Sequence, residues 1–136
     1  MAREFTLSVV SPDQSVVEQL VTSVVAPGTE GYFGIQAGHI SLVAALKPGL
    51  LEYKANNQTG YIYIGGGFAE VRPDKMTVLA DEASLAEELS VEKAEQMLEK
   101  ARKELRSDSG TMTQSDAVQE VERAIQRLRA ARLNAK

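Results

Sequence analysis

GTEGYFGIQAGHISL, residues 28–42, is the stretch of the chain that constrains its fold most strongly. It holds four glycines in fifteen residues, which alternate with apolar side chains and lie beside the only histidine, His39. A flexible linker would consist of glycine and serine without side chains that pack. Because glycine reaches positive φ and permits close backbone approach at no steric cost, the pattern predicts a shaped loop, a folded corner presented by a rigid scaffold.

The residues around this stretch, from Glu4 to about Ala80, have the pattern of an all-β domain. Short runs rich in Val, Ile, Leu, Tyr and Thr are separated by Gly, Pro, Asn or Asp, which is typical of a sandwich or barrel. The predicted strands lie at residues 4–9, 21–26, 42–46, 50–55, 60–64, 68–72 and 75–80. Turns are expected at residues 47–49, 56–59 and 73–74. Residues 65–67 predict a bulge or corner, because no phosphate-loop ending follows the glycines.

After Asp81 the periodicity becomes helical. Residues 82–88 form an acidic connector, and Ser90 then stands at the N-cap position of a first helix. Its apolar positions, spaced by three and four, are Val91, Ala94, Leu98, Ala101 and Leu105. A break at residues 107–110 precedes a capping-box-like start at Thr113 and Asp116. The second stripe is Val118, Val121, Ile125 and Leu128, with Ala117, Ala124 and Ala131 beside it.

The two apolar stripes predict an antiparallel hairpin of two helices. Each stripe is thin, and burying roughly four aliphatic side chains per helix at ~1.5–3 kcal/mol each must offset the ordering entropy of the whole tail. The hairpin is therefore expected to be marginal, hence movable, whereas the strands form the rigid part.

Composition excludes several classes of protein. With 43% hydrophobic and 25% charged residues, the chain is ordinary for a globular protein. It has no apolar run of the ~18 residues that a membrane span needs, and its start lacks the apolar region of a secretory signal. Without cysteine it has no disulfide, no thiolate metal site and no cysteine nucleophile.

The net charge of −4 is divided unevenly, with −6 in residues 1–89 and +2 in residues 90–136. Five cations and no acid follow Glu122: Arg123, Arg127, Arg129, Arg132 and Lys136. Two interpretations stay open, a solvated helix end and a docking surface for an acidic partner. A nucleic acid partner is not expected, because the chain is acidic overall and its tail has no aromatic residue for stacking.

Few residues could support catalysis. His39 is the only imidazole, and although Ser41 is near it in sequence, nothing places an orienting acid or an oxyanion hole. The sequence has one histidine, no cysteine, no EF-hand pattern and no dense carboxylate cluster. It therefore predicts no metal site and no cofactor. The chain is therefore interpreted as a binding and regulatory protein, not an enzyme.

Taken in order, residues 28–42, Lys47-Pro48-Gly49, GGGFAEV at 65–71 and VLAD at 78–81 resemble the epsilon subunit of bacterial F-type, proton-translocating ATP synthases. With the helical tail, the resemblance spans nearly the full length. It implies a mixed fold, with an N-terminal ten-stranded β-sandwich at residues 1–85 and a C-terminal antiparallel two-helix hairpin at residues 86–136. It also implies a non-catalytic central-stalk (rotor) subunit, peripheral on the cytoplasmic face of the plasma membrane without insertion into it.

The resemblance implies three partners: the gamma subunit, the c-subunit ring and the catalytic alpha/beta head. Matching positions place Glu30 and Gly31 in the loop that meets the c ring, and His39 on the surface facing gamma. Tyr32, in the same loop, differs from the acidic residue that some members carry there. In many bacterial members of the family, a basic final helix docks in the head and opposes ATP hydrolysis. The matching residues here are Arg123, Arg127, Arg129 and Arg132.

Some family members bind ATP through Leu-Asp-x-x-Arg-Ala at the start of the first helix. Here Ser90 replaces the aspartate and Lys93 the arginine. Because lysine keeps the charge but lacks the guanidinium fork, ATP binding at this site is expected to be weak or absent.

Two alternatives come from other classes. One is a free-standing regulatory adaptor, with a β-sandwich binding module and a tail that forms a coiled coil. The other is a small hydrolase that uses His39. Recovery of gamma and c subunits together with the chain would distinguish the rotor subunit from both.

Overall fold

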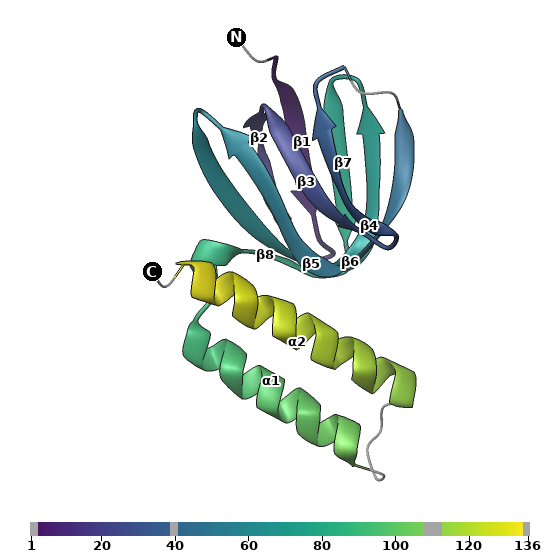
Figure 1. Cartoon of the computed structure of the whole chain (residues 1–136), viewed down its shortest axis with the longest axis vertical. Coiled ribbons are helices and arrows are strands. Elements are labelled where there is room, and N and C mark those ends of the chain that lie inside the picture. Colours follow the sequence, from purple (N-terminus) through teal and green to yellow (C-terminus); the bar gives the residue numbers. More distant parts are fainter. Residues whose placement is uncertain (1–2, 39–40, 108–112, 135–136) are drawn as a thin grey trace. The chain divides into compact units, whose positions relative to one another are not determined.

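Eight strands and then two α-helices follow one another in the computed structural model, which describes residues 3–38, 41–107 and 113–134 (Figure 1). The strands are β1 (Phe5–Val10), β2 (Ser15–Val21), β3 (Ser23–Gly28), β4 (Gly31–Gln36), β5 (Leu42–Ala55), β6 (Gln58–Arg72), β7 (Lys75–Ala80) and β8 (Ala83–Leu85). A short 3-10 turn η1 (Ala86–Glu88) precedes the helices α1 (Val91–Arg106) and α2 (Gln114–Asn134). The chain divides into two compact units, Met1–Leu85 and Ala86–Lys136.

The strands form one mixed sheet in the order β2-β1-β7-β6-β5-β3-β4, with β8 also paired to β6. Neighbours are antiparallel except β1 and β7, which are parallel. Strand β2 also contacts β5 and β8, with which it does not pair, so the sheet folds over a single core. The largest apolar side chains that are almost fully buried in this core are Leu7, Leu51, Ile62, Ile64 and Met76.

Strands β5 and β6 each continue through a bend at which the sequence pattern predicted an interruption. They stay paired from the pair Leu42 and Val71 at one end to the pair Ala55 and Gln58 at the other. The predicted corner at residues 65–67 is confirmed, since Gly67 has φ +136° and a Cβ there would overlap the Leu79 carbonyl oxygen. The ten strands that the resemblance implies are not found among the described residues, which form eight. Strand β5 covers both ranges predicted at 42–46 and 50–55, and β6 covers both ranges predicted at 60–64 and 68–72.

Residues 28–36 of the glycine-rich stretch belong to a hairpin instead of the predicted shaped loop. Strands β3 and β4 are paired from Ser23, which is opposite Gln36, to Gly28, which is opposite Gly31. Within β4 the buried Ile35 alternates with its exposed neighbours, which is the period of a half-buried strand. Glycines at every third or fourth position hid that alternation in the sequence.

Other local predictions had mixed outcomes. The β5–β6 hairpin is confirmed, and its loop residues Asn56 and Asn57 adopt positive φ of 53° and 64°. The strand predicted at 21–26 instead spans the end of β2 and most of β3. The prediction of an acidic connector at residues 82–88 is wrong in part, because Ala83–Leu85 forms strand β8, which pairs with β6.

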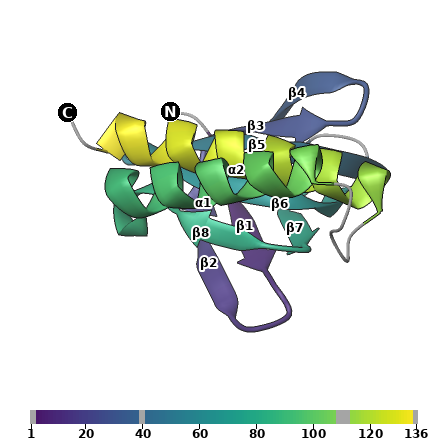
Figure 2. The same ribbon diagram turned by 90° about the horizontal axis from the view of Figure 1, so that it is seen from below.

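Helices α1 and α2 lie side by side and antiparallel (Figures 1 and 2). The predicted caps are confirmed: Ser90 Oγ accepts a hydrogen bond from the Lys93 N–H (3.3 Å), and Thr113 Oγ1 accepts one from the Asp116 N–H (3.1 Å). Of the predicted break, residues 108–110 lie outside the described residues. The buried residues between the helices are Ala94, Leu98, Ala101, Ala124, Leu128 and Ala131.

The predicted apolar stripe of α2 is wrong in part. Val118 and Ile125 are 42% and 43% exposed, whereas Ala124 and Ala131 are buried against α1. Small side chains allow two helix axes to approach closely, so α2 turns its alanines toward α1 and leaves larger side chains outside.

Candidate functional site

The tip of the β3–β4 hairpin carries Glu30, Gly31 and Tyr32, which the sequence associated with the c ring. Gly28 pairs with Gly31, so only Thr29 and Glu30 form the loop. Gly31 has φ +126°, and the Thr29 N–H donates to the Ala45 carbonyl oxygen (3.0 Å). The exposed Glu30 carboxylate is thus presented on a short loop whose base is attached to β5.

Tyr32 extends from this tip toward the bend of β5. Its Oη accepts a hydrogen bond from the Leu50 N–H (3.3 Å), and Lys47 Nζ lies 5.8 Å from the centre of its ring. The second geometry is that of a cation–π contact. The sequence pattern did not reveal either contact, because β3 separates β4 from β5 in the sheet.

Apolar side chains form a row across the outer face of the sheet, from β1 over β7 and β6 to β5. Val10 is opposite Leu79, Leu79 is opposite Phe68, and Phe68 is opposite Ala45. Val43 lies two positions from Ala45 on the same strand, hence on the same face. Phe68, Leu79 and Val43 are 58%, 57% and 70% exposed. These five residues, called the apolar row below, were not identified from the sequence, although the unbroken apolar run at 78–80 was a signal.

A shallow hollow of about 390 Å³ adjoins the row at Val43. It is lined by Ser41, Leu42, Val43, Glu70, Val71, Arg72, Pro73 and Asp74. Glu70 and Arg72 form an ion pair of 3.4 Å at its edge. His39, predicted to face gamma, lies outside the described residues. The described residues that flank it are at the hollow, since Ser41 lines it and the Gly38 N–H donates to the Pro73 carbonyl oxygen (2.9 Å).

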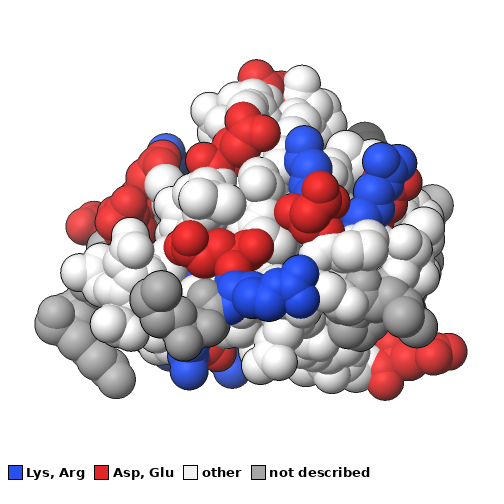
Figure 3. Space-filling model, turned by 90° about the horizontal axis from the view of Figure 1, so that it is seen from above, with Lys and Arg blue, Asp and Glu red and all other residues white. Residues whose placement is uncertain are grey.

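Charged residues on the face seen in Figure 3 do not gather by sign. Acidic and basic side chains lie next to each other in that view, with uncharged surface between them. Close ion pairs of opposite sign are worth little in exposed positions, so this face offers no single strongly charged surface to a partner.

The four arginines expected to dock are not equivalent. Glu120, which precedes them in α2, lies 3.7 Å from Arg123 Nη1 and 3.1 Å from Arg127 Nη2. Arg129 and Arg132 are exposed, and Arg129 Nη1 donates to the Gln126 side-chain oxygen (3.4 Å). The end of α2 therefore carries two arginines paired with a carboxylate of their own helix and two that face outward.

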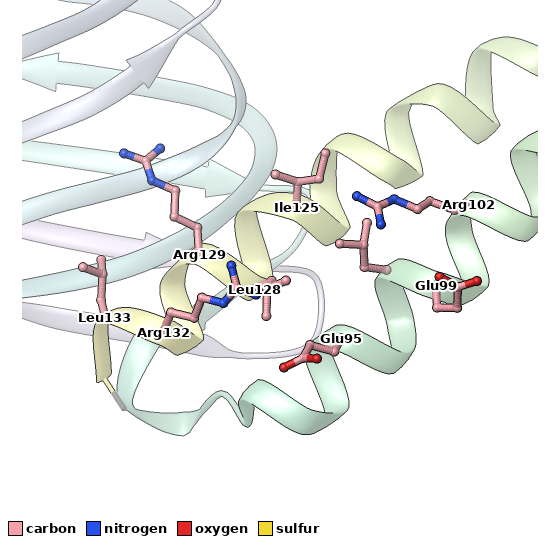
Figure 4. A pocket seen from close by; sticks show the side chains of 9 residues that line it. Glu95, Glu99, Arg102, Ile125, Leu128, Arg129, Arg132 and Leu133 are labelled. Carbon is pink, nitrogen blue, oxygen red and sulfur yellow. The ribbon is translucent and has the colours of Figure 1, made fainter. Parts of the chain in front are cut away.

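A groove of about 840 Å³ lies between α1 and α2 (Figure 4). Its lining residues are Glu95, Leu98, Glu99 and Arg102 of α1, and Ile125, Leu128, Arg129, Arg132 and Leu133 of α2. Three guanidinium groups and two carboxylates line it together with the leucines and isoleucine, and the Arg129 guanidinium extends away from that of Arg102 (Figure 4). Ser90 and Lys93 do not line this groove, and the Ser90 hydroxyl already caps α1.

The described residues include no group of three His, Asp or Glu side chains that could hold a metal ion. No helix among residues 3–38, 41–107 and 113–134 is long and apolar enough to cross a membrane. Three described surfaces carry the features given above: the hairpin tip, the apolar row and the face of α2 that carries the arginines.

Comparisons with known proteins agree with one another. Residues 4–86 match the family described as the ATP synthase delta/epsilon chain, beta-sandwich domain. The ATP synthase epsilon chain of Nitratidesulfovibrio vulgaris is 37% identical over 129 residues, covering 95% of this chain and 96% of that protein. The epsilon chain of a Synechococcus species is 40% identical over 130 residues, covering 93% and 96%.

Two solved structures are similar in fold. A chain from the Euglena gracilis mitochondrial ATP synthase, in a structure of OSCP, F1 and the c-ring, has a TM-score of 0.78 and 26% identity, covering 96% of this chain and 81% of that one. A chain from the central stalk and c-ring of the Tetrahymena thermophila mitochondrial ATP synthase has a TM-score of 0.56 and 12% identity, covering 98% of each. The second likeness concerns the fold alone.

Proposed function

The chain belongs to the family of ATP synthase epsilon chains, and from this premise we propose which of its surfaces bind which partners in the enzyme. It is a subunit of the rotor stalk, with a structural and regulatory role. In the cell it lies at the periphery of the bacterial plasma membrane, on the cytoplasmic face, as part of the assembled ATP synthase. The match to ATP synthase epsilon chains supports a place in the assembled enzyme.

The apolar row is the observation that carries the assignment of a partner surface. Scattered apolar residues are normal on a protein surface, whereas contiguous ones mark interaction sites. Phe68 and Leu79 lie side by side near the centre of the row, and the hollow beside Val43 extends the surface to Ser41, two residues after His39 in the sequence. This face binds the gamma subunit, the partner that a stalk subunit holds throughout rotation.

The hairpin tip binds the polar loops of the c ring. Glu30 is exposed on a two-residue loop, Gly31 leaves room for close backbone approach, and Tyr32 offers an amphipathic ring. The likeness to a chain of the Euglena gracilis ATP synthase, in a structure that contains the c-ring, supports this assignment.

The second helix opposes ATP hydrolysis. When α2 leaves α1 and extends into the catalytic alpha/beta head, Arg123, Arg127, Arg129 and Arg132 bind carboxylates there. The thin core between α1 and α2 supports such a release, because the buried cluster that the described residues form between them consists of two leucines and four alanines. The outward-facing Arg129 and Arg132 supply the first contacts, and Arg123 and Arg127 exchange Glu120 for carboxylates of the head.

Affinity recovery tests the assignment of the partner surfaces. A tagged full-length chain is expected to recover gamma and c subunits from detergent-solubilised membranes. The double variant Phe68→Gln, Leu79→Gln should lose most of the gamma subunit while it stays folded, because both side chains are already exposed. Leu20→Gln is the matched control, since Leu20 is 55% exposed on β2 and outside the apolar row.

Recovery of neither subunit by the wild-type chain would favour the free-standing adaptor. If the double variant recovers gamma at the wild-type level, the apolar row does not bind gamma, and the contact lies on another face.

A further inference from the structure

The attachment of the Glu30 tip to the sheet is interrupted just before the tip. Val25 of β3 pairs with Glu52 of β5, and the next pair is Gly28 with Leu46, so two residues of β3 stand against five of β5. One of the two is Pro27, which has no N–H to donate. Backbone pairing therefore holds the base of the tip less firmly than an unbroken ladder would.

Tyr32 crosses this interruption. It is opposite Pro27 in the β3–β4 pairing, and its Oη accepts the hydrogen bond of the Leu50 N–H at 3.3 Å. The contact joins the hairpin strand β4 directly to the bulged part of β5. The Tyr32 side chain thus supplies a connection that the β3–β5 ladder lacks at this point.

Gly49 provides the space for this connection. A Cβ at position 49 would lie 2.6 Å from Pro27 Cβ and 2.8 Å from Tyr32 Oη, closer than real Cβ contacts. Glycine is therefore required here for close approach. Two positions earlier, Lys47 Nζ lies 5.8 Å from the centre of the Tyr32 ring, so a second residue of the β5 bend contacts the same side chain.

We propose that Tyr32 is the positioning residue of the c-ring contact: it fixes the Glu30 loop to the bend of β5, so that the loop meets the c ring already ordered. The inference rests on the proposed binding of the c ring by this tip. Because an ordered loop loses less conformational entropy on binding, the Leu50–Tyr32 hydrogen bond raises affinity without Tyr32 having to contact the partner itself.

The test uses F1 complexes assembled with the full-length chain and membranes that contain the c ring but are stripped of F1. Tyr32→Phe removes only the hydroxyl, and is expected to weaken binding about fivefold, which is the effect of one neutral hydrogen bond. Tyr32→Ala also removes the ring and should weaken it further. Tyr61→Phe, a half-buried tyrosine of β6, is the matched control and should bind as the wild type.

Two further measurements separate positioning from a general structural role. In Tyr32→Phe the amide of Leu50 should exchange its hydrogen faster, while recovery of gamma stays unchanged. In a Glu30→Gln background, Tyr32→Phe should have little additional effect, because the hydroxyl acts through the placement of Glu30. A full fivefold effect in that background would show that Tyr32 acts independently of Glu30 and would overturn the proposal.

The failures are distinguishable. If Glu30→Gln weakens c-ring binding but Tyr32→Phe does not, or if the Leu50 exchange rate is unchanged, the positioning role is overturned and the c-ring contact stands. If Glu30→Gln and Tyr32→Ala both bind as tightly as the wild type, the tip does not bind the c ring, and the positioning role falls with that assignment.

Discussion

The strand unit and the helix unit differ sharply in what they bury. Among the described residues, the core cluster of the strand unit holds eighteen buried apolar residues, most of them Val, Leu or Ile, whereas the cluster between the two helices holds four alanines and two leucines. At ~1.5–3 kcal/mol for each large side chain, the two leucines contribute only ~3–6 kcal/mol. The difference indicates a rigid scaffold joined to a tail whose helix pairing a partner can compete with.

The largest expected effect is in the strand unit. Leu51→Ala leaves a cavity in a fully buried position and should lower the free energy of unfolding by ~2–5 kcal/mol. Urea denaturation followed by the β-type circular dichroism measures it. Leu20→Ala, at an exposed position, is the control and should change the value by less than ~0.5 kcal/mol. Equal effects of the two would mean that the core is elsewhere.

In the helix unit, a substitution that costs less free energy is expected to unfold more of the structure. Leu98→Ala removes one of the two buried leucines, with an expected loss of about 2 kcal/mol, because Leu98 also borders the open groove. Helical circular dichroism at 222 nm should fall while the urea midpoint of the strands stays constant. A parallel decrease of both signals would make the two units one cooperative structure.

The third prediction concerns release of the tail in the assembled enzyme. Replacing four arginines together by alanine should raise the ATP hydrolysis rate about 5–30-fold, as expected if ~1–2 kcal/mol of docking energy is lost. The positions are Arg123, Arg127, Arg129 and Arg132. Alanine favours helix, so the fold of α2 should persist. An unchanged rate in a fully assembled complex would show that these arginines do not dock and are only the solvated end of a helix.

A control with the same loss of charge replaces four lysines elsewhere by alanine, at Lys54, Lys75, Lys100 and Lys103. The partial variants sharpen the result further. Because Arg123 and Arg127 must leave Glu120 before they can dock, Arg129→Ala with Arg132→Ala should account for more of the rise than the other pair.

Helix caps should have a smaller effect, of about 1 kcal/mol. Ser90→Ala removes the hydroxyl that accepts from the Lys93 N–H, which destabilises the first turn of α1. The loss should be seen in the thermal midpoint of the helical signal. Ser115→Ala, at an exposed position inside α2, is the matched control and should be neutral or slightly stabilising.

The smallest expected effect is that of removing the tail. A chain that ends after Glu88 keeps strand β8 and should retain cooperative unfolding of the strands, with a midpoint close to that of the full chain. It should also recover gamma as the full chain does. Non-cooperative unfolding of this fragment would contradict the division into a scaffold and a separable tail.

Local features were predictable from the sequence, and long-range ones were not. Asn56 and Asn57 tolerate positive φ without help from the rest of the fold, and Ser90 and Thr113 cap helices through bonds to residues three positions away. The side of α2 that faces α1 was predicted incorrectly at Ile125, because spacing defines a stripe only to within the rotation that packing selects. Strand β5 was predicted as two strands, because Lys47 and Pro48 have the pattern of a turn, and only the pairing with β6 shows that the strand continues through them.

By itself, the sequence determined the order of strands and then helices, the caps, the tight turns at residues 56–57 and 73–74 and the resemblance to epsilon chains, because each depends on residues close together or on motifs kept in order. Only the tertiary structure decided the register that joins Val10, Leu79, Phe68 and Ala45 into one row, and the contact of Tyr32 with Leu50 across an intervening strand. Sheet register is set by which strands bury their apolar faces together. That choice is made by the whole core, and no local stretch of the chain contains it.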